Sequence, residues 1–195
     1  NSSLGFPITE NGYKKFNCES VDVGFLLKLD ISKKGKEALL YGTYFGGNDS
    51  TNFSALAIDQ NNYVYITGIT QSSDFPVTEN SYKTKVTGGL SSAFITKFDL
   101  EKDGEEGVLY SSLLCGNGEE AGYGIAVDLE ENVYITGTTN SREDFPISEN
   151  AFQKNIYAIE GSGFFIKLDT KLCGDNGLIY GTYLGGNGSD VCSDI

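Results

Sequence analysis

The sequence predicts an all-β protein made of four-stranded antiparallel sheets that recur with a period of about 70 residues. A Phe-Pro pair recurs at Phe6, Phe75 and Phe145. An apolar segment that ends in Lys-x-Asp and a segment that runs from Tyr to Gly recur with the same steps, at residues 25–30, 94–99 and 164–169, and at 41–47, 110–116 and 180–186. The 25 Gly, the 3 Pro and the 12 Tyr with 12 Phe are typical of short strands joined by tight turns.

The first two strands of each unit are predicted to form a hairpin. Apolar segments flank a short polar turn at residues 55–68 and again at 124–137. Asp59 and Asp128 begin these turns, where a carboxylate can accept backbone N–H groups. Asn62 suits a left-handed backbone conformation within the turn, and Glu131 at the matching place suits it less well.

The third and fourth strands are the Phe-to-Asp and Tyr-to-Gly segments. Apolar residues occupy both faces of these strands, as Phe94 and Phe98 alternate with Ile95, which indicates sheets covered on both sides. A four-stranded unit that buries its faces only against copies of itself is a propeller blade. Solenoid coils have shorter repeats of roughly 20–50 residues, and an immunoglobulin sandwich has no such internal period.

The motif order Tyr-x-Thr-Tyr-Leu-Gly-Gly, Val-Asp…Val-Tyr-Ile-Thr-Gly, Asp-Phe-Pro and Phe-x-x-Lys-Leu-Asp resembles the SBBP-type β-propeller repeat over nearly the whole chain. Two places depart from that pattern: Cys115 stands where Gly is usual, and residues 60–62 and 129–131 lack the usual turn Gly. The resemblance implies a non-catalytic repeat of secreted and surface proteins.

The repeat boundaries predict one propeller-like domain over residues 1–195. Residues 1–47 make a partial blade, 48–116 and 117–186 make two blades, and 187–195 begin a further blade. Closed propellers have roughly four to eight blades. We therefore expect an open structure or one completed by neighbouring chains: an excised piece of a longer propeller, one protomer of a ring, or a unit of a polymer.

The charge of the chain limits its partners. A formal net charge of −13 repels phosphate backbones, so we expect no nucleic-acid partner. No apolar run approaches the roughly 20 residues of a membrane helix, so we expect no membrane insertion.

Cysteines and glycosylation sequons favour an extracellular or cell-surface location. Two disulfides among Cys18, Cys115, Cys173 and Cys192 fit an oxidising compartment, with three pairings open and free buried thiols as the alternative. Four N-x-S/T sequons are glycosylation candidates: Asn1, Asn48, Asn52 and Asn187.

The sequence contains no catalytic motif. It has no His, which excludes Ser-His-Asp and Cys-His arrangements, and its Gly-rich segments precede no Lys-Ser/Thr pair. We expect no enzyme activity and no resident cofactor; calcium is the one ion considered, on the oxygen-rich stretches at residues 46–52, 59–63 and 186–194. A row of Lys28, Lys97 and Lys167 is expected to cover apolar surface and to pair with nearby acids.

These observations predict a non-catalytic structural or interaction module that associates with copies of itself through its blades, as a filament, adhesive or surface-layer subunit. Two alternatives stay open. One is an extracellular module that binds glycans or other surface proteins, and the other is a fragment of a larger propeller protein.

Overall fold

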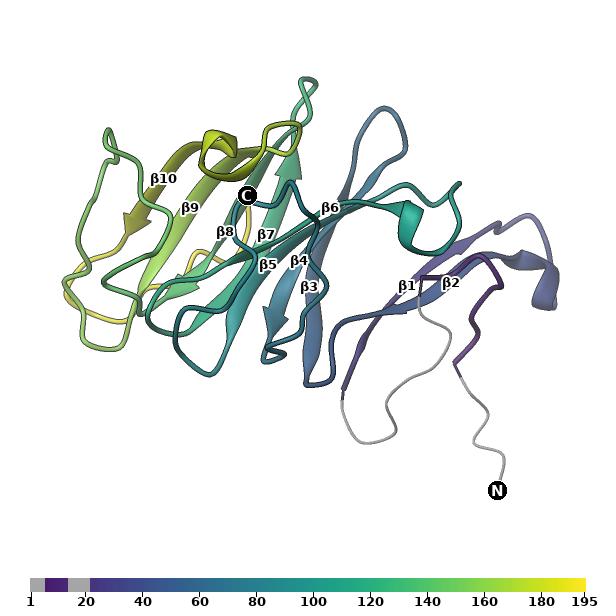
Figure 1. Ribbon diagram of the computed structural model, residues 1–195, viewed down its shortest axis with the longest axis horizontal. Coiled ribbons are helices and arrows are strands. Elements are labelled where there is room, and N and C mark those ends of the chain that lie inside the picture. The colour runs from purple at the N-terminus through teal and green to yellow at the C-terminus, as the bar shows by residue number, and fades with distance from the viewer. Residues whose placement is uncertain (1–5, 14–21) are drawn as a thin grey trace.

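The computed structural model describes residues 6–13 and 22–195, which form three antiparallel sheets lying side by side (Figure 1). The first sheet has two strands, β1 (Gly24–Leu29) and β2 (Leu39–Phe45). The middle and last sheets have four strands each. A short 3₁₀ helix precedes the final strand of each of the three sheets. Their bounds are β3 (Thr51–Ile58), β4 (Val64–Thr70), β5 (Ser92–Phe98), β6 (Val108–Leu114), β7 (Glu120–Val127), β8 (Asn132–Thr139), β9 (Ser162–Asp169), β10 (Leu178–Leu184), η1 (Gly35–Ala38), η2 (Gly104–Gly107) and η3 (Gly174–Gly177).

Each four-stranded sheet is a meander in which neighbours in sequence pair in space. The strand order is β3-β4-β5-β6 in the middle sheet and β7-β8-β9-β10 in the last. The predicted all-β class with four-stranded antiparallel units is confirmed. The Lys-x-Asp segments form β1, β5 and β9, and the Tyr-to-Gly segments form most of β2, β6 and β10.

The Gly of the Val-Tyr-Ile-Thr-Gly motif stands opposite a β-bulge. The register of β3 against β4 shifts between Phe53 and Ala55, opposite Gly68, and that of β7 against β8 shifts between Gly122 and Gly124, opposite Gly137. A Cβ added at Gly68 would lie 2.0 Å from the carbonyl oxygen of Asn52. The motif therefore contains Gly because the bulged backbone approaches too closely for any side chain.

The hairpin turns have the predicted chemistry. Asp59 Oδ1 accepts the backbone N–H groups of Asn61 at 2.8 Å and Tyr63 at 3.0 Å. Asp128 Oδ1 does the same for Glu130 and Asn132. Asn62 and Glu131 both have positive φ, at 64° and 67°, so Glu131 adopts the left-handed conformation in spite of its unfavourable side chain.

The hydrophobic core lies between the sheets. Every sheet has a start face, turned toward the preceding sheet, and an end face, turned toward the following one. One buried cluster joins the end face of the first sheet to the start face of the middle sheet, and a second joins the middle sheet to the last. Strand β7 packs on β3 and β4, so the inner strands of adjacent sheets lie together. The blades thus bury their apolar residues only against each other, as the two-sided strands predict.

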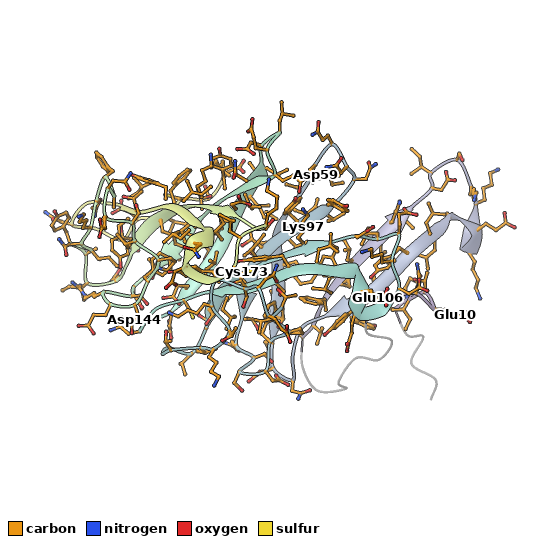
Figure 2. The ribbon with its side chains drawn as sticks, turned by 45° about the horizontal axis from the view of Figure 1, so that its top comes forward. Glu10, Asp59, Lys97, Glu106, Asp144 and Cys173 are labelled. Atoms are coloured by element: carbon orange, nitrogen blue, oxygen red, sulfur yellow. The ribbon has the colours of Figure 1, made fainter. Side chains whose placement is uncertain are left out.

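The expected disulfides do not form among the described cysteines. Cys115, Cys173 and Cys192 are all free, and Cys18 lies outside the described residues. Cys115 is buried just after β6, and Cys173 is exposed in the segment before η3 and β10. Figure 2 labels Cys173. The expectation of two bridges is therefore corrected for these three thiols, because the repeat places them at unrelated positions of the blade.

No helix in the described parts of the chain is long and apolar enough to cross a membrane.

Candidate functional site

The end face of the last sheet repeats the residues of a buried interface but is only partly covered within the described structure. In the middle sheet, the end-face residues Tyr65 and Tyr110 are 0 % and 1 % exposed because the last sheet packs on them. The equivalent residues of the last sheet, Tyr134 and Tyr180, are only partly buried. Phe165 is likewise half-buried where Ile95 is fully buried.

The exposed end-face side chains form a ladder that we call the aromatic ladder, consisting of Tyr134, Phe165, Lys167 and Tyr180. The ring centroids of Tyr134 and Phe165 lie 6.1 Å apart, and those of Phe165 and Tyr180 lie 6.0 Å apart. Lys167 Nζ lies 4.8 Å from the centroid of the Tyr134 ring. Three aromatic rings and one lysine ammonium therefore line the exposed part of this face.

Each lysine of the predicted row forms an ion pair with an acidic side chain. For two of them the acid belongs to the neighbouring sheet, and for the third it belongs to the same sheet. Lys28 pairs with Glu101 and Lys97 with Glu131, so each of these contacts joins one sheet to the next. Lys167 instead pairs with Asp128 of its own sheet, at 3.5 Å. Side-chain exposure is 7 % for Lys97 and 25 % for Lys167, so the last lysine is the more accessible.

Asp128 connects the hairpin turn to the aromatic ladder. Its Oδ2 accepts hydrogen bonds from the Tyr134 hydroxyl and from Asn132 Nδ2, both at 2.8 Å. Desolvation raises the pKa of Asp128, but hydrogen bonds from Asn132 and Tyr134 and the charge of Lys167 outweigh it and hold this pKa at about 2. The carboxylate is therefore charged at neutral pH and fixes the tyrosine at the open face.

The start face of the first sheet is also exposed. Phe25 and Leu29 are 53 % and 55 % exposed, although their counterparts in the middle sheet, Phe94 and Phe98, are fully buried. Phe6 stacks beside Phe25 with ring centroids 4.1 Å apart and also contacts Tyr44 at 5.7 Å. A hollow of about 220 Å³ beside β1 is lined by Phe25, Leu26, Phe53, Leu56 and Ile66.

Residues 187–195 lie along the last sheet without forming a strand. The Cys192 N–H donates to the Gly137 carbonyl at 3.2 Å, and Thr138 Oγ1 donates to the Asp190 carbonyl at 3.4 Å. A Cβ at Gly163 would lie 2.5 Å from Cys192 Sγ. The segment thus rests over the inner part of the end face, where the repeat places the first strand of a further blade, and it leaves the aromatic ladder partly exposed.

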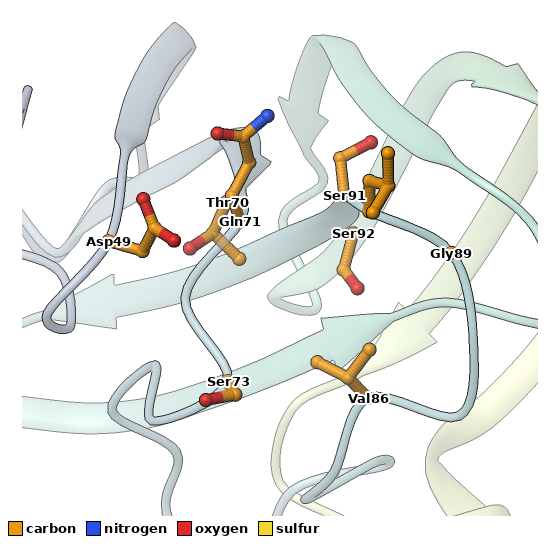
Figure 3. A pocket seen from close by; sticks show the side chains of 9 residues that line it. Asp49, Thr70, Gln71, Ser73, Val86, Gly89, Ser91 and Ser92 are labelled. Atoms are coloured by element: carbon orange, nitrogen blue, oxygen red, sulfur yellow. The ribbon is translucent and has the colours of Figure 1, made fainter.

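A polar pocket of about 330 Å³ opens beside the loop between β4 and β5 (Figure 3). It is lined by Asp49, Thr70, Gln71, Ser73, Val86, Gly89, Leu90, Ser91 and Ser92. The Ser92 hydroxyl is buried and has no hydrogen-bond partner among the described residues. No basic residue lines the pocket, so it suits a neutral polar group better than an anion.

A second, smaller pocket of about 210 Å³ lies between the middle and last sheets, and Glu120 lines it. This carboxyl is 1 % exposed and accepts hydrogen bonds from Thr139 at 3.0 Å, from Ser141 and from the Gly116 N–H. Burial raises the pKa of Glu120 to about 7, and the hydrogen bonds oppose this effect only in part. No sequence pattern marks this glutamate, because its counterpart in the middle sheet is Thr51.

The remaining candidates lie on the surface. The sequon residues Asn48, Asn52 and Asn187 are exposed, and Asn48 Nδ2 donates to Asp74 at 2.6 Å; Asn1 is outside the described residues. Within residues 6–13 and 22–195, no group of three or more acidic or cysteine side chains could hold a metal ion. The stretches considered for calcium therefore gather no such group in the described structure.

These repeated elements match a known family. Residues 40–76 and 120–146 match the model of the SBBP beta-propeller repeat. These two stretches are similar to the SBBP beta-propeller repeat. The first match covers most of β2 in the first sheet, the β3–β4 hairpin of the middle sheet and the Phe75-Pro76 corner, and the second covers the β7–β8 hairpin of the last sheet and the Phe145-Pro146 corner. No curated protein matches the sequence. The resemblance predicted from the sequence is thus confirmed at residues 40–76 and 120–146.

Proposed function

We propose that this chain is a non-catalytic structural or interaction module that associates with copies of itself through its blades. The observation that carries the proposal is the contrast between equivalent residues. Tyr65, Lys97 and Tyr110 are buried by the last sheet, whereas Tyr134, Lys167 and Tyr180 stay partly exposed within the described residues.

The exposed faces provide the driving force for association. Both Phe25 and Leu29 are about half exposed on the start face, and such contiguous apolar surface marks interaction sites on soluble proteins. Fully burying one aromatic or leucine side chain is worth about 1.5–3 kcal/mol. Several such residues at each end make blade contacts favourable even after the entropic cost of association.

A secreted or cell-surface location is part of this proposal. Exposed sequons at Asn52 and Asn187 support it, and so does the acidic charge of −13, which keeps a protein with exposed apolar ends soluble. A filament, an adhesive or a surface layer are the assemblies that fit such a subunit.

Light scattering over a concentration series tests the proposal. We expect the mean mass to rise above 21.0 kDa as the concentration of the chain increases, and negative-stain images to show regular rings or polymers. A constant mass of 21.0 kDa up to high concentration would exclude self-association as the function.

Glycan binding is the second candidate, and the orphaned Ser92 hydroxyl favours it. Sugar hydroxyls both donate and accept hydrogen bonds, so one of them can satisfy Ser92 while Gln71 and Asp49 hold its neighbours (Figure 3). Val86 supplies an apolar wall on which the C–H face of a sugar ring can pack.

Titration with neutral mono- and oligosaccharides, followed by NMR, tests this candidate. Ser92→Ala should abolish binding without loss of thermal stability, because the hydroxyl makes no hydrogen bond within the described structure. Ser162→Ala is the matched control, since Ser162 is the equivalent unpartnered hydroxyl of the last sheet and does not line this pocket. Equal binding by both variants would reject the pocket as the site.

A further inference from the structure

We infer that two copies of the chain stack head to tail, with the end face of one copy covering the start face of the next. The inference rests on the proposed self-association and adds its geometry. It names the surface of each partner and excludes symmetric pairing of like faces.

The two exposed faces are the two halves of an interface that the chain already forms internally. In the junction between the middle and last sheets, Tyr65, Ile95 and Tyr110 pack on the partner residues Ile135, Phe164, Leu168 and Tyr183. By the repeat, the aromatic ladder corresponds to the first of these sets, and Phe25, Leu29 and Tyr44 correspond to members of the second.

The same interface occurs a second time within the chain. At the junction of the first and middle sheets, Leu26 and Tyr41 pack on Ile66, Phe94 and Phe98. Two occurrences with different side chains show that this face pairing tolerates variation in packing detail. Stacking of two chains would form the same junction a third time, with the geometry that both internal junctions already have.

The docked C-terminal segment leaves room for this contact. Residues 187–195 lie over Gly137 and Gly163 at the inner part of the end face. The first sheet consists of β1 and β2, the counterparts of the two outer strands β9 and β10. The segment of one copy and the first sheet of the next therefore occupy different parts of the same face.

Charge supports the pairing of unlike faces. The loop between β1 and β2 carries three exposed lysines, Lys33, Lys34 and Lys36, and two acids, Asp30 and Glu37, with Lys33 paired to Asp30 at 3.7 Å. The loop is therefore net positive in a chain of net charge −13. In the internal junctions, the turns and loops at this end of neighbouring sheets touch: Asn61 donates to Glu131 at 3.0 Å, and Lys28 pairs with Glu101. Stacking brings the lysine loop to the end of the last sheet that carries Asp128, Glu130 and Asp169.

Single-face variants test the stacking. Phe25→Asp disables the start face, and Phe165→Asp disables the end face. Each variant alone should remain at 21.0 kDa, because head-to-tail contact needs one intact face of each kind. An equimolar mixture of the two variants should give dimers of about twice that mass and nothing larger. In each dimer the intact end face of one variant covers the intact start face of the other, and the two faces left over are disabled.

Leu90→Asp is the matched control, because Leu90 is 76 % exposed and lies in the loop before β5, outside the strands that make the two faces. It should associate like the unmodified chain, and circular dichroism should show that all variants keep their sheets. Two results would overturn the inference while leaving self-association intact: dimers of Phe25→Asp alone, or a monomeric mixture when the unmodified chain still associates. A monomeric unmodified chain would instead reject the proposed function itself.

Discussion

Lys97 Nζ lies 2.7 Å from Glu131 Oε2, and this ion pair ties the middle sheet to the hairpin turn of the last sheet. The ammonium also lies 4.5 Å from the ring centroid of Tyr63 and 5.1 Å from that of Tyr65. Glu131 adopts a positive φ of 67°, which is an unfavourable backbone conformation for this residue. Its ion pair with the buried Lys97 offsets that cost.

Removing the Glu131 charge should therefore weaken the junction between blades. We expect Glu131→Gln to lower the free energy of unfolding by about 1–3 kcal/mol, because Lys97 is left buried with only aromatic faces and a neutral amide. Urea denaturation with an unchanged slope measures the effect. Glu130→Gln is the control in the same turn, since only its main-chain groups are bonded; an equal loss in both variants would contradict the ion-pair explanation.

The close backbone approach at Gly137 predicts a severe effect of a small substitution. A Cβ there would lie 2.0 Å from the Ala121 carbonyl oxygen, so Gly137→Ala must displace strand β7. We expect a loss of more than about 2 kcal/mol in the free energy of unfolding, measured by urea denaturation. Gly186→Ala should be nearly neutral, because no atom lies within 4 Å of its Cβ position and its φ is not positive; similar losses would show that the bulge tolerates a side chain.

Buried Glu120 predicts a stability that falls as pH rises toward neutrality. Its folded pKa of about 7 is above the ordinary value of 4.5, so the folded chain binds this proton more tightly than the unfolded chain does. The stabilisation is therefore complete below pH 4.5 and is lost as pH rises through about 7. The raised pKa of Glu120 corresponds to a change of about 3 kcal/mol at most in the free energy of unfolding between low and high pH.

Glu120→Gln should remove that part of the pH dependence, because a neutral amide cannot titrate. Unfolding curves at pH 5 and pH 8 compare the two proteins. Glu119→Gln serves as the control, since Glu119 is exposed next to the same strand. A pH dependence that persists unchanged in Glu120→Gln would show that another group causes it.

The three described thiols should differ sharply in reactivity. With Cys18 replaced by Ser, we expect Cys173 to react at once with a thiol reagent, because it is exposed. Cys192 should react slowly, since burial and the neighbouring Asp190 raise the pKa of its thiol. Cys115, which is fully buried, should react only on unfolding. Mass spectrometry of peptides after timed labelling gives the order, and early modification of Cys115 would contradict the burial.

The sequence by itself determined the blade. Its period placed the Lys-x-Asp strands and the hairpins with their Asp59 and Asp128 turns, because each depends on contacts within about 70 residues of chain that repeat. The bulges opposite Gly68 and Gly137 became visible only in the structure. Only the tertiary structure decided which faces are covered. Tyr65 and Tyr134 are equivalent in sequence, yet one is buried and the other is not, because burial depends on whether another sheet follows.

The same limit explains Glu120 and the thiols. A glutamate at a position occupied by Thr51 in the preceding unit gives no signal in the sequence that burial will raise its pKa, because burial arises from the loops packed around it. Cysteine count and compartment favoured disulfides, but bond formation requires proximity in space. The fold places Cys115, Cys173 and Cys192 at separate sites of the blades, and that placement follows from packing between sheets and not from composition.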